Sequence, residues 1–376
     1  MKFVLAPDSF KGTIRSPEVC DILAEAIGEV IPGAECVKVP LADGGEGSLD
    51  AVSVSGGEIR TVTVRDPLGR PVQARYLAWP EQRRAMVEMS EASGLELLRP
   101  EERHPLLTGT YGTGQLLQSA RLAGAKEIIV AIGGSATVDG GLGLAMALGA
   151  QALDKNGREV KPCGGSLADV CEIRLGSLLD DWRGVKIRIA SDVTNPLLGA
   201  RGAATVFGPQ KGATPEEVDM LEHGLANWAD CLLKAGLCQD CEHPGDGAAG
   251  GLGFALRVLL GGVAQSGARL IAELLELPEK LRGADFLITG EGRTDSQTAF
   301  GKLPAVVAEI AQEAGVPAVL LSGSLETGAD LGGHFLAAFS TVTENLPLEQ
   351  ILAAARPNLK RQAKNLASIL KLAKSQ

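Results

Sequence analysis

Short apolar runs and stretches of helical periodicity alternate along the first sixty residues. Apolar runs at residues 2–6 and 36–39 predict two strands. Between them, apolar residues recur at helical spacing from Val19 to Val30, in a helix that Ser16 is expected to cap. A second helix is expected from about residue 47. This β-α-β-α order is typical of a parallel sheet.

A different pattern begins near Ile59. The segment "IRTVTVRD" alternates, "DPLG" is a turn sequence, and "PVQARYLAW" is another extended run, so a hairpin is expected here. A third run, "RAMVEMS", is a candidate to extend the hairpin. Helices and strands then alternate again at 112–150 and from about residue 240, with further strands expected at 127–132, 185–192, 284–289, 316–321 and 335–340.

This pattern describes a parallel α/β domain that the chain leaves and later rejoins. A length of 376 residues also suits two domains better than one. The fold class that we expect is therefore α/β with two domains. One is a discontinuous Rossmann-like domain with a parallel sheet, formed by residues 1–58 and 240–376, and in one alternative it also includes 112–150. The other is an inserted mixed α/β domain at 59–239.

Composition and charge argue against several classes of binding partner. The net charge of −10 argues against a nucleic-acid partner, and no apolar run reaches the ~18 residues of a membrane span. The first residues are too short an apolar run for a signal peptide. Seven irregularly spaced cysteines favour a reducing cytoplasm, so we expect a cytoplasmic protein. Cys238 and Cys241 form one CxxC pair, for which a zinc site is the alternative to a plain loop.

Candidate chemistry gathers in four loops that follow predicted strands: "LAPDSFKG", "VPLADGGEG", "IVAIGGSATVDGG" and "LITGEGRTDSQT". Glycines let backbone N–H groups approach an anion, and carboxylates suit a hard cation such as Mg²⁺. Together these features suit phosphoryl transfer. The sequence has no Walker A motif, no complete GxGxxG and no GxSxG, which argues against a P-loop NTPase, a standard dinucleotide fold and a serine hydrolase.

The motifs "LAPDSFKGTI", "PLADGGEGS", "AIGGSATVDGGLG", "SDVTNPLLG", "VFGPQKGA", "PGDGAAGGLGFAL" and "ITGEGRTDSQTAFGKLP" occur in this order. Together they resemble the class I glycerate kinase family along essentially the whole chain. Residues 13–15 and Val138 depart slightly from the family pattern. The resemblance implies an ATP- and Mg²⁺-dependent kinase of D-glycerate, with its active site in a cleft between two domains.

The resemblance further implies 2-phosphoglycerate as the product, with 3-phosphoglycerate as the alternative. Two other classes remain as hypotheses: an NAD(P)-dependent oxidoreductase of a small hydroxy acid, and a non-catalytic anion sensor. The incomplete GxGxxG motifs count against the first, and the acids in the loops count against the second. Glycerate and ATP are the expected partners, and the chain is expected to be a monomer or a homodimer.

A kinase of glycerate needs a group that accepts the hydroxyl proton and groups that bind the substrate carboxylate. Asp192, after a predicted strand, is our candidate base, with Asp8 and Asp43 as alternatives; a turn role is the alternative for Asp192. Arg293 and Lys11 are the candidates for carboxylate binding and complete the catalytic set. The alternative for Arg293 is simple pairing with its acidic neighbours. The remaining expected substrate contacts are Asp8, Ser9, Asn195 and Asp295.

The remaining candidate residues are expected to bind phosphate or metal. The expected phosphate-binding residues lie in the glycine-rich loops: Gly44, Gly45, Gly133, Gly134, Ser135, Gly250 and Gly251. Those expected to hold Mg²⁺ are carboxylates: Asp43, Glu46, Asp139 and Glu291. A Gly-Gly pair can also be only a tight turn. The loop "GPQKG", with Lys211, is a candidate lid.

Overall fold

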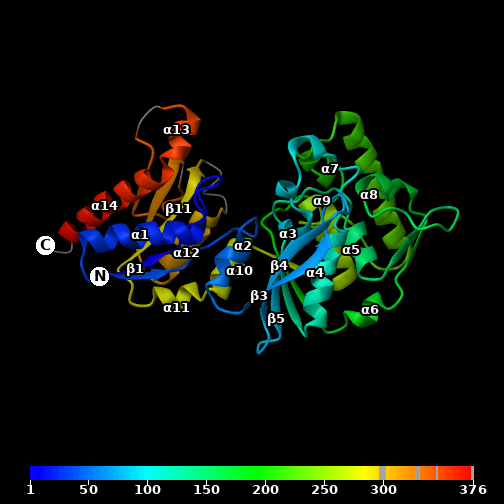
Figure 1. Cartoon of the computed structure of the whole chain (residues 1–376), viewed down its shortest axis with the longest axis horizontal. Coiled ribbons are helices and arrows are strands. Elements are labelled where there is room, and N and C mark those ends of the chain that lie inside the picture. Colours follow the sequence, from blue (N-terminus) through cyan, green and yellow to red (C-terminus); the bar gives the residue numbers. More distant parts are fainter. Residues whose placement is uncertain (296–301, 327, 329–330, 344–345, 374–376) are drawn as a thin grey trace. The chain divides into compact units, whose positions relative to one another are not determined.

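The computed structural model describes residues 1–295, 302–326, 328, 331–343 and 346–373. It divides into two compact α/β units, shown in Figure 1. Unit 1 is Met1–Asp43, Asp50–Ser55 and Ala268–Gln376, and unit 2 is Gly44–Leu49 and Gly56–Gly267. One unit has a parallel sheet and the other a mixed sheet, so the expected fold class is confirmed.

Unit 1 is built on a parallel sheet with the strand order β13-β12-β11-β1-β2. β1 pairs with β11, which lies more than 280 residues later in the chain, so the chain returns to the sheet where it began. The strands are β1 (Lys2–Leu5), β2 (Glu35–Lys38), β11 (Phe286–Thr294), β12 (Ala318–Leu325) and β13 (Ala337–Ser340). The helices are α1 (Ser16–Val30), α2 (Ser48–Ser53), α10 (Gly267–Leu274), α11 (Leu277–Leu281), α12 (Leu303–Glu313), α13 (Leu348–Ala353) and α14 (Ala355–Ala373).

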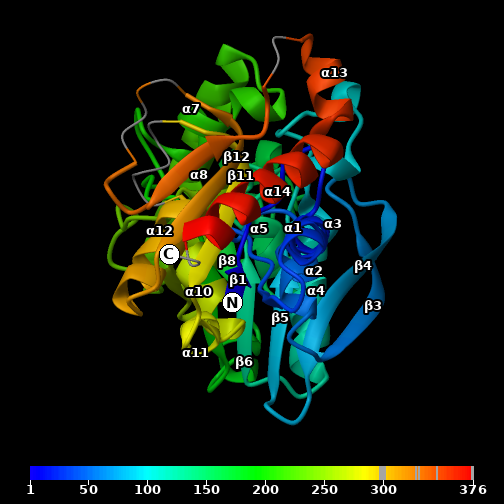
Figure 2. The ribbon, with the colours of Figure 1, turned by 90° about the vertical axis from the view of Figure 1, so that its left-hand side faces the viewer.

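Helices α1 and α14 lie side by side over one face of this sheet, as Figure 2 shows. Their apolar residues bury Phe3, Leu5 and Ile288. Basic residues of α14 pair with acids of α1, for example Lys360 with Glu25 at 2.7 Å. The apolar stripe of α1 is thus buried, as its periodicity predicted. Its first residue is Ser16, however, and Arg15 occupies the cap position.

The segment Gly290–Thr294 is part of a strand, whereas the sequence predicted that the strand ended at residue 289. β11 continues through Thr294, and its pairing with β12 extends from Leu287 to Thr294. A Cβ atom on Gly290 would overlap the carbonyl oxygen of Leu321, and one on Gly323 would overlap that of Gly292. These glycines therefore allow two backbones to approach closely, and they do not end the strand.

Unit 2 is built on a mixed sheet with the order β10-β9-β6-β5-β4-β3. β5, β6, β9 and β10 are parallel, and the predicted hairpin, β3 and β4, adds antiparallel strands at one edge. The strands are β3 (Glu58–Arg65), β4 (Pro71–Trp79), β5 (Arg84–Glu88), β6 (Glu127–Ala131), β9 (Lys186–Ala190) and β10 (Val263–Gln265), with a separate pair β7 (Gln151–Leu153) and β8 (Glu172–Arg174). The helices are α3 (Ser90–Ser93), α4 (Tyr111–Leu122), α5 (Leu142–Ala147), α6 (Leu178–Asp181), α7 (Ala203–Phe207), α8 (Pro215–Lys234) and α9 (Ala248–Leu260).

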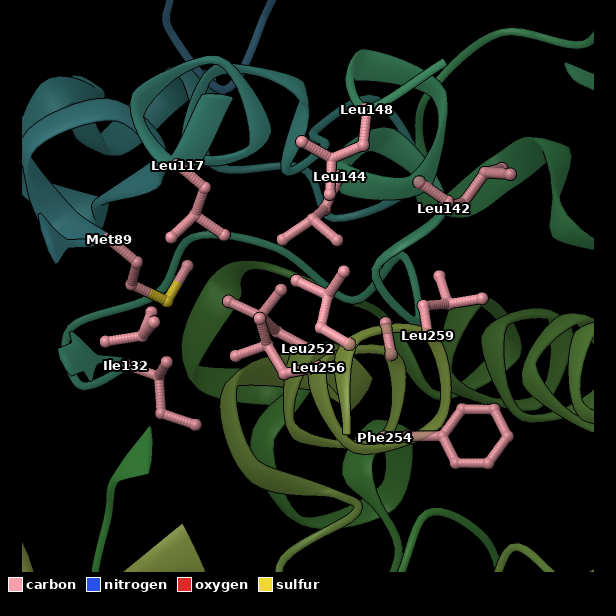
Figure 3. Packing of buried hydrophobic residues seen from close by; sticks show 14 of the residues in the cluster. Met89, Leu117, Ile132, Leu142, Leu144, Leu148, Leu252, Phe254, Leu256 and Leu259 are labelled. Carbon is pink, nitrogen blue, oxygen red and sulfur yellow. The ribbon is translucent and has the colours of Figure 1, made fainter. Parts of the chain in front are cut away.

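The core of unit 2 joins helices from distant parts of the chain. Leu117 of α4, Leu144 of α5, and Leu252 and Leu256 of α9 point toward one another in Figure 3. α8 begins with the predicted capping box, in which the Thr214 side chain accepts from the backbone N–H of Glu217. Among the helices described, none combines the length and apolar character that a membrane crossing requires.

The compact units and the domain boundaries expected from the sequence differ at residues 44–49, 56–58 and 240–267. Residues 240–267 lie in unit 2 because α9 packs against β9, α5 and α7. Residues 112–150 also lie there, as in the main prediction and not in its alternative, because β6 pairs with β5 and β9. Residues 44–49 leave unit 1 briefly, since Gly44 bonds to the turn after β6. Alternation of helix and strand looks the same in both units, which is why the sequence pattern did not separate them.

Candidate active site

The carboxyl ends of four parallel strands form one row in unit 2. Glu88 of β5 pairs with Ala131 of β6, which pairs with Ala190 of β9, which pairs with Gln265 of β10. In open α/β sheets, ligands bind beyond this edge. The residues that follow the row are therefore the first place to look for a site in unit 2.

The turn after β6 packs against the loop 44–49. Gly133 donates its N–H to the carbonyl oxygen of Gly44 at 3.0 Å, and a Cβ on Gly133 would overlap Gly45. Glu88 holds the other end of the loop, because its carboxylate accepts from the N–H groups of Gly47 at 3.0 Å and Leu49 at 2.7 Å. Gly44, Gly45 and Gly133 therefore build the turn by close backbone contact.

The next two residues, Gly134 and Ser135, face outward. Gly134 is exposed with φ of 74°, and Ser135 is half-buried. Lys211 lies behind them, where its Nζ donates to Ser135 Oγ at 2.7 Å and to the carbonyl oxygen of Thr137 at 2.8 Å. The Lys211 side chain is buried against the loop 133–139, and the lid role of its own loop stays a prediction.

Asp192 follows β9 and lines a pocket of about 490 Å³, within the usual range for small-molecule sites. Its wall combines apolar residues such as Ile132 and Val193 with polar ones. Asp192 is exposed. The neighbouring candidate, Asn195, does not line this pocket, and its side-chain N–H donates to the Arg201 carbonyl at 2.8 Å, which holds a turn.

Asp139, expected to bind metal, is fully enclosed. Its Oδ2 accepts from Thr110 N at 2.7 Å, Thr110 Oγ1 at 2.8 Å and Gly143 N at 3.1 Å, and its Oδ1 accepts from Gly141 N at 3.2 Å. Burial raises the pKa of the carboxyl, and these donors act to lower it. A cation could reach Asp139 only by breaking these bonds. We therefore remove it from the candidate metal ligands.

Gly250 and Gly251, expected to bind phosphate, pack inward instead. A Cβ on Gly250 would overlap the Thr137 carbonyl, and one on Gly251 would lie 2.7 Å from the Gly140 Cα. Gly140 donates its N–H to the Gly250 carbonyl at 3.0 Å. With Ala249, they form three successive left-handed residues inside α9, with φ of 53°, 68° and 91°. The pair serves close backbone packing, so we also remove it from the phosphate-binding residues.

Unit 1 gathers acids at the corresponding edge of its sheet. Asp8 follows β1, Asp43 lies after β2, and Glu291 lies in β11. Burial, Asp43 and Glu291 together raise the pKa of Asp8 to about 7, although the Ser9 N–H donates to its carboxylate at 2.6 Å. Thr294 Oγ1 donates to Glu291 Oε1 at 2.9 Å. The structure thus brings three of the predicted carboxylates of unit 1 together.

The predicted cations of unit 1 lie beside these acids. Lys11 is exposed in the turn after Phe10, and a Cβ on Gly292 would lie 3.1 Å from its backbone nitrogen. Arg293 is exposed on β11. Asp295, an expected substrate contact, accepts from Lys302 Nζ at 2.8 Å. Lys11 and Arg293 are therefore placed to attract an anion near the acids, while Asp295 has an ion-pair partner.

Within the described parts of the chain, no three His, Cys, Asp or Glu side chains are arranged to hold a metal ion. This includes the CxxC pair, whose thiols are half-buried with pKa values raised by burial. Mg²⁺, however, usually takes only one or two carboxylates and completes its shell with water and phosphate oxygens. The mutual repulsion of Asp8, Asp43 and Glu291 is the charge pattern that such a cation would relieve.

Sequence reasoning missed some residues that build the site in unit 2. Asp246 and Arg257 line the pocket with Asp192 and form a two-pronged ion pair, with both bonds at 2.7 Å. Glu88 holds the loop 44–49, as described above. Asp246 lies inside the quoted "PGDGAAGG" motif, but its partner lies eleven residues later, at a spacing that no simple pattern marks.

Parallel strands that end in glycine turns and carboxylates, as in both units, are typical of α/β enzymes that bind a small molecule beyond the carboxyl ends of the strands. The model of the glycerate kinase family matches residues 3–371, and the chain belongs to that family. The expected enzyme class, a phosphotransferase with an alcohol group as acceptor, is thereby confirmed.

The similarity to known relatives extends along the whole chain. A glycerate kinase of Bacillus subtilis is 41% identical and covers 100% of this chain and 99% of its own length. A glycerate 2-kinase of Escherichia coli is 40% identical, with 98% of each covered. A crystal structure from Salmonella typhimurium LT2, whose description names glycerate kinase 2, has a TM-score of 0.88 at 40% identity, with both chains fully covered.

Proposed function

We propose that this chain transfers the γ-phosphoryl group of ATP to D-glycerate, giving 2-phosphoglycerate and ADP. The observation that carries the proposal is the arrangement along one sheet edge of unit 2. There an exposed carboxylate, Asp192, lines a small-molecule pocket after β9, and the outward-facing turn Gly134–Ser135 follows β6. Phosphoryl transfer depends on positioning and on charge neutralisation, and this edge offers groups for both.

Unit 2 supplies the base and the phosphate contacts in this proposal. Asp192 accepts the proton of the attacking glycerate hydroxyl, as carboxylates do in many kinases. Gly134 and Ser135 donate hydrogen bonds to phosphate oxygens, while Gly44, Gly45 and Gly133 shape the turn that presents them. Asn195 keeps its side-chain oxygen as an acceptor for a substrate hydroxyl.

Unit 1 supplies charge. Arg293 and Lys11 bind the glycerate carboxylate, since an arginine can pair with a carboxylate through two bonds. Asp43 and Glu291, with Asp8 beside them, would hold Mg²⁺, and Glu46 of the loop 44–49 remains a separate metal candidate in unit 2. When bound, Mg²⁺ would neutralise charge on the phosphate oxygens. Ser9 fixes the orientation of Asp8.

Phosphorylation at the second carbon is proposed because the Escherichia coli relative carries the name glycerate 2-kinase. The same groups could also serve transfer to the terminal hydroxyl, which would give 3-phosphoglycerate. An assay of ADP release with D-glycerate, ATP and Mg²⁺ tests the activity, and phosphorus NMR of the product distinguishes the two hydroxyls.

Asp192→Asn tests the proposed base. The variant keeps the size of the side chain but does not accept a proton, so kcat should fall by about 10²-fold or more, with the KM for ATP nearly unchanged. Asp219→Asn, on the exposed surface of α8, is the matched control and should keep normal turnover. Near-normal turnover of a folded Asp192→Asn variant would remove Asp192 from the mechanism.

A further inference from the structure

Lys211 is a buried cation that has no role among the contacts of the proposed reaction. Its side chain is 2% exposed, and its two hydrogen bonds both go to the strand-end loop 133–139, at Ser135 Oγ and the Thr137 carbonyl. Asp139 is the charged group that acts on it, and burial lowers the pKa of Lys211 to about 7. A lysine is rarely buried unless its charge is paired and hydrogen-bonded.

The bond to Ser135 determines what the serine hydroxyl can do. An ammonium group only donates, so Ser135 Oγ must accept from Lys211. The hydroxyl hydrogen then has to find another acceptor. None of the described residues accepts it. Because the side chain is only half-buried, the hydroxyl can donate to a ligand bound outside the loop.

The backbone beside this hydroxyl is also a donor. The N–H groups of Gly134 and Ser135 have no acceptor in the described part of the protein. Gly134 has φ of 74°, a left-handed conformation that commonly lets successive N–H groups converge on an anion. Two N–H groups and one O–H group therefore share one short turn, with a cation directly behind it.

We propose that Lys211 is a positioning residue for phosphoryl binding, which orients the Ser135 hydroxyl as a donor to a phosphate oxygen. The inference rests on the proposed function of Gly134 and Ser135 as phosphate contacts.

The test is binding of inorganic tripolyphosphate, measured by titration calorimetry in metal-free buffer. Lys211→Met and Ser135→Ala should each weaken this binding about tenfold, the loss expected for one charged hydrogen bond. In the double variant, Lys211→Met should add less than about twofold, because its effect passes through the serine. Lys234→Met, a lysine exposed on α8, removes the same charge and should bind normally.

A purely structural lysine would give a different result. It would lower stability in urea, and its effect on binding would add to that of Ser135→Ala. Additive losses, or normal binding by Ser135→Ala, would overturn the proposal, as would a wild-type protein that fails to bind tripolyphosphate. If Lys211→Met does not fold, Lys211→Gln provides the same comparison. Failure of glycerate turnover alone would refute the proposed function and leave this binding measurement intact.

Discussion

Replacing Asp139 by asparagine separates a structural carboxylate from a metal ligand. The wild-type side chain accepts four hydrogen bonds at 2.7–3.2 Å, three of them on Oδ2. An asparagine can keep its oxygen at the Oδ2 position, but its NH₂ group then faces the N–H of Gly141. Two donors oppose each other there, and the remaining three bonds lose the help of the negative charge.

The cost follows from these contacts. One buried donor left without an acceptor costs about 1–3 kcal/mol, and hydrogen bonds to a charged acceptor are worth about 1 kcal/mol more than those to a neutral one. Part of this loss is returned, because the neutral side chain does not pay the desolvation that raises the pKa of Asp139. We expect the free energy of unfolding to fall by about 2–4 kcal/mol.

Urea unfolding with and without Mg²⁺ measures this loss. Asp139→Asn should lose stability equally in both buffers, because the carboxylate binds backbone and not metal. Asp219→Asn, on the exposed surface of α8 in the same unit, is the control and should unfold like the wild type. Wild-type stability of Asp139→Asn combined with a raised Mg²⁺ requirement in the kinase assay would refute this reasoning and restore Asp139 as a ligand.

Two further predictions concern residues that contact the loop 133–139. In urea unfolding, Gly250→Ala should lower the free energy of unfolding by several kcal/mol more than Gly261→Ala. Both glycines have a left-handed φ, of 68° and 64°, but only a Cβ at Gly250 clashes, with the Thr137 carbonyl; equal losses would contradict this. The second concerns Lys211, whose pKa is about 7 when folded and ordinarily 10.5, so the unfolded chain binds the extra proton between these values. The free energy of unfolding should therefore rise with pH there by up to about 1.4 kcal/mol per pH unit relative to Lys211→Met, and parallel pH profiles would contradict this.

Hydrophobic patterning predicted much of the fold. The strand and helix order, the hairpin at β3 and β4, and the capping box at Thr214 all follow from local periodicity and turn chemistry. The loops after β1, β6 and β9 were also predicted to carry the polar residues. Local signals suffice for these features, because a helix face or a hairpin depends on residues close in sequence.

The direction in which a loop residue points is not a local property. Asp139 and Asp192 both follow glycine-rich or turn-like sequence after a strand, yet the first is enclosed by Thr110 and Gly143 and the second is exposed. Lys211 looks like a surface lysine between two glycines and is buried against a loop more than seventy residues earlier. Such differences depend on tertiary contacts that periodicity does not contain.

The glycine pairs show why composition alone could not locate the phosphate contacts. Gly133, Gly250 and Gly251 lack room for a side chain because backbone or side-chain atoms occupy the place of a Cβ. At Gly134, in contrast, a Cβ would meet its nearest neighbour, the Cβ of Ser90, at 3.5 Å, an ordinary contact, so close packing does not require this glycine. The closely packed glycines hold the turns together, whereas Gly134 is exposed and its N–H has no acceptor among the described residues. The proposed phosphate contacts in unit 2 are therefore Gly134 and Ser135, and not the closely packed glycine pairs.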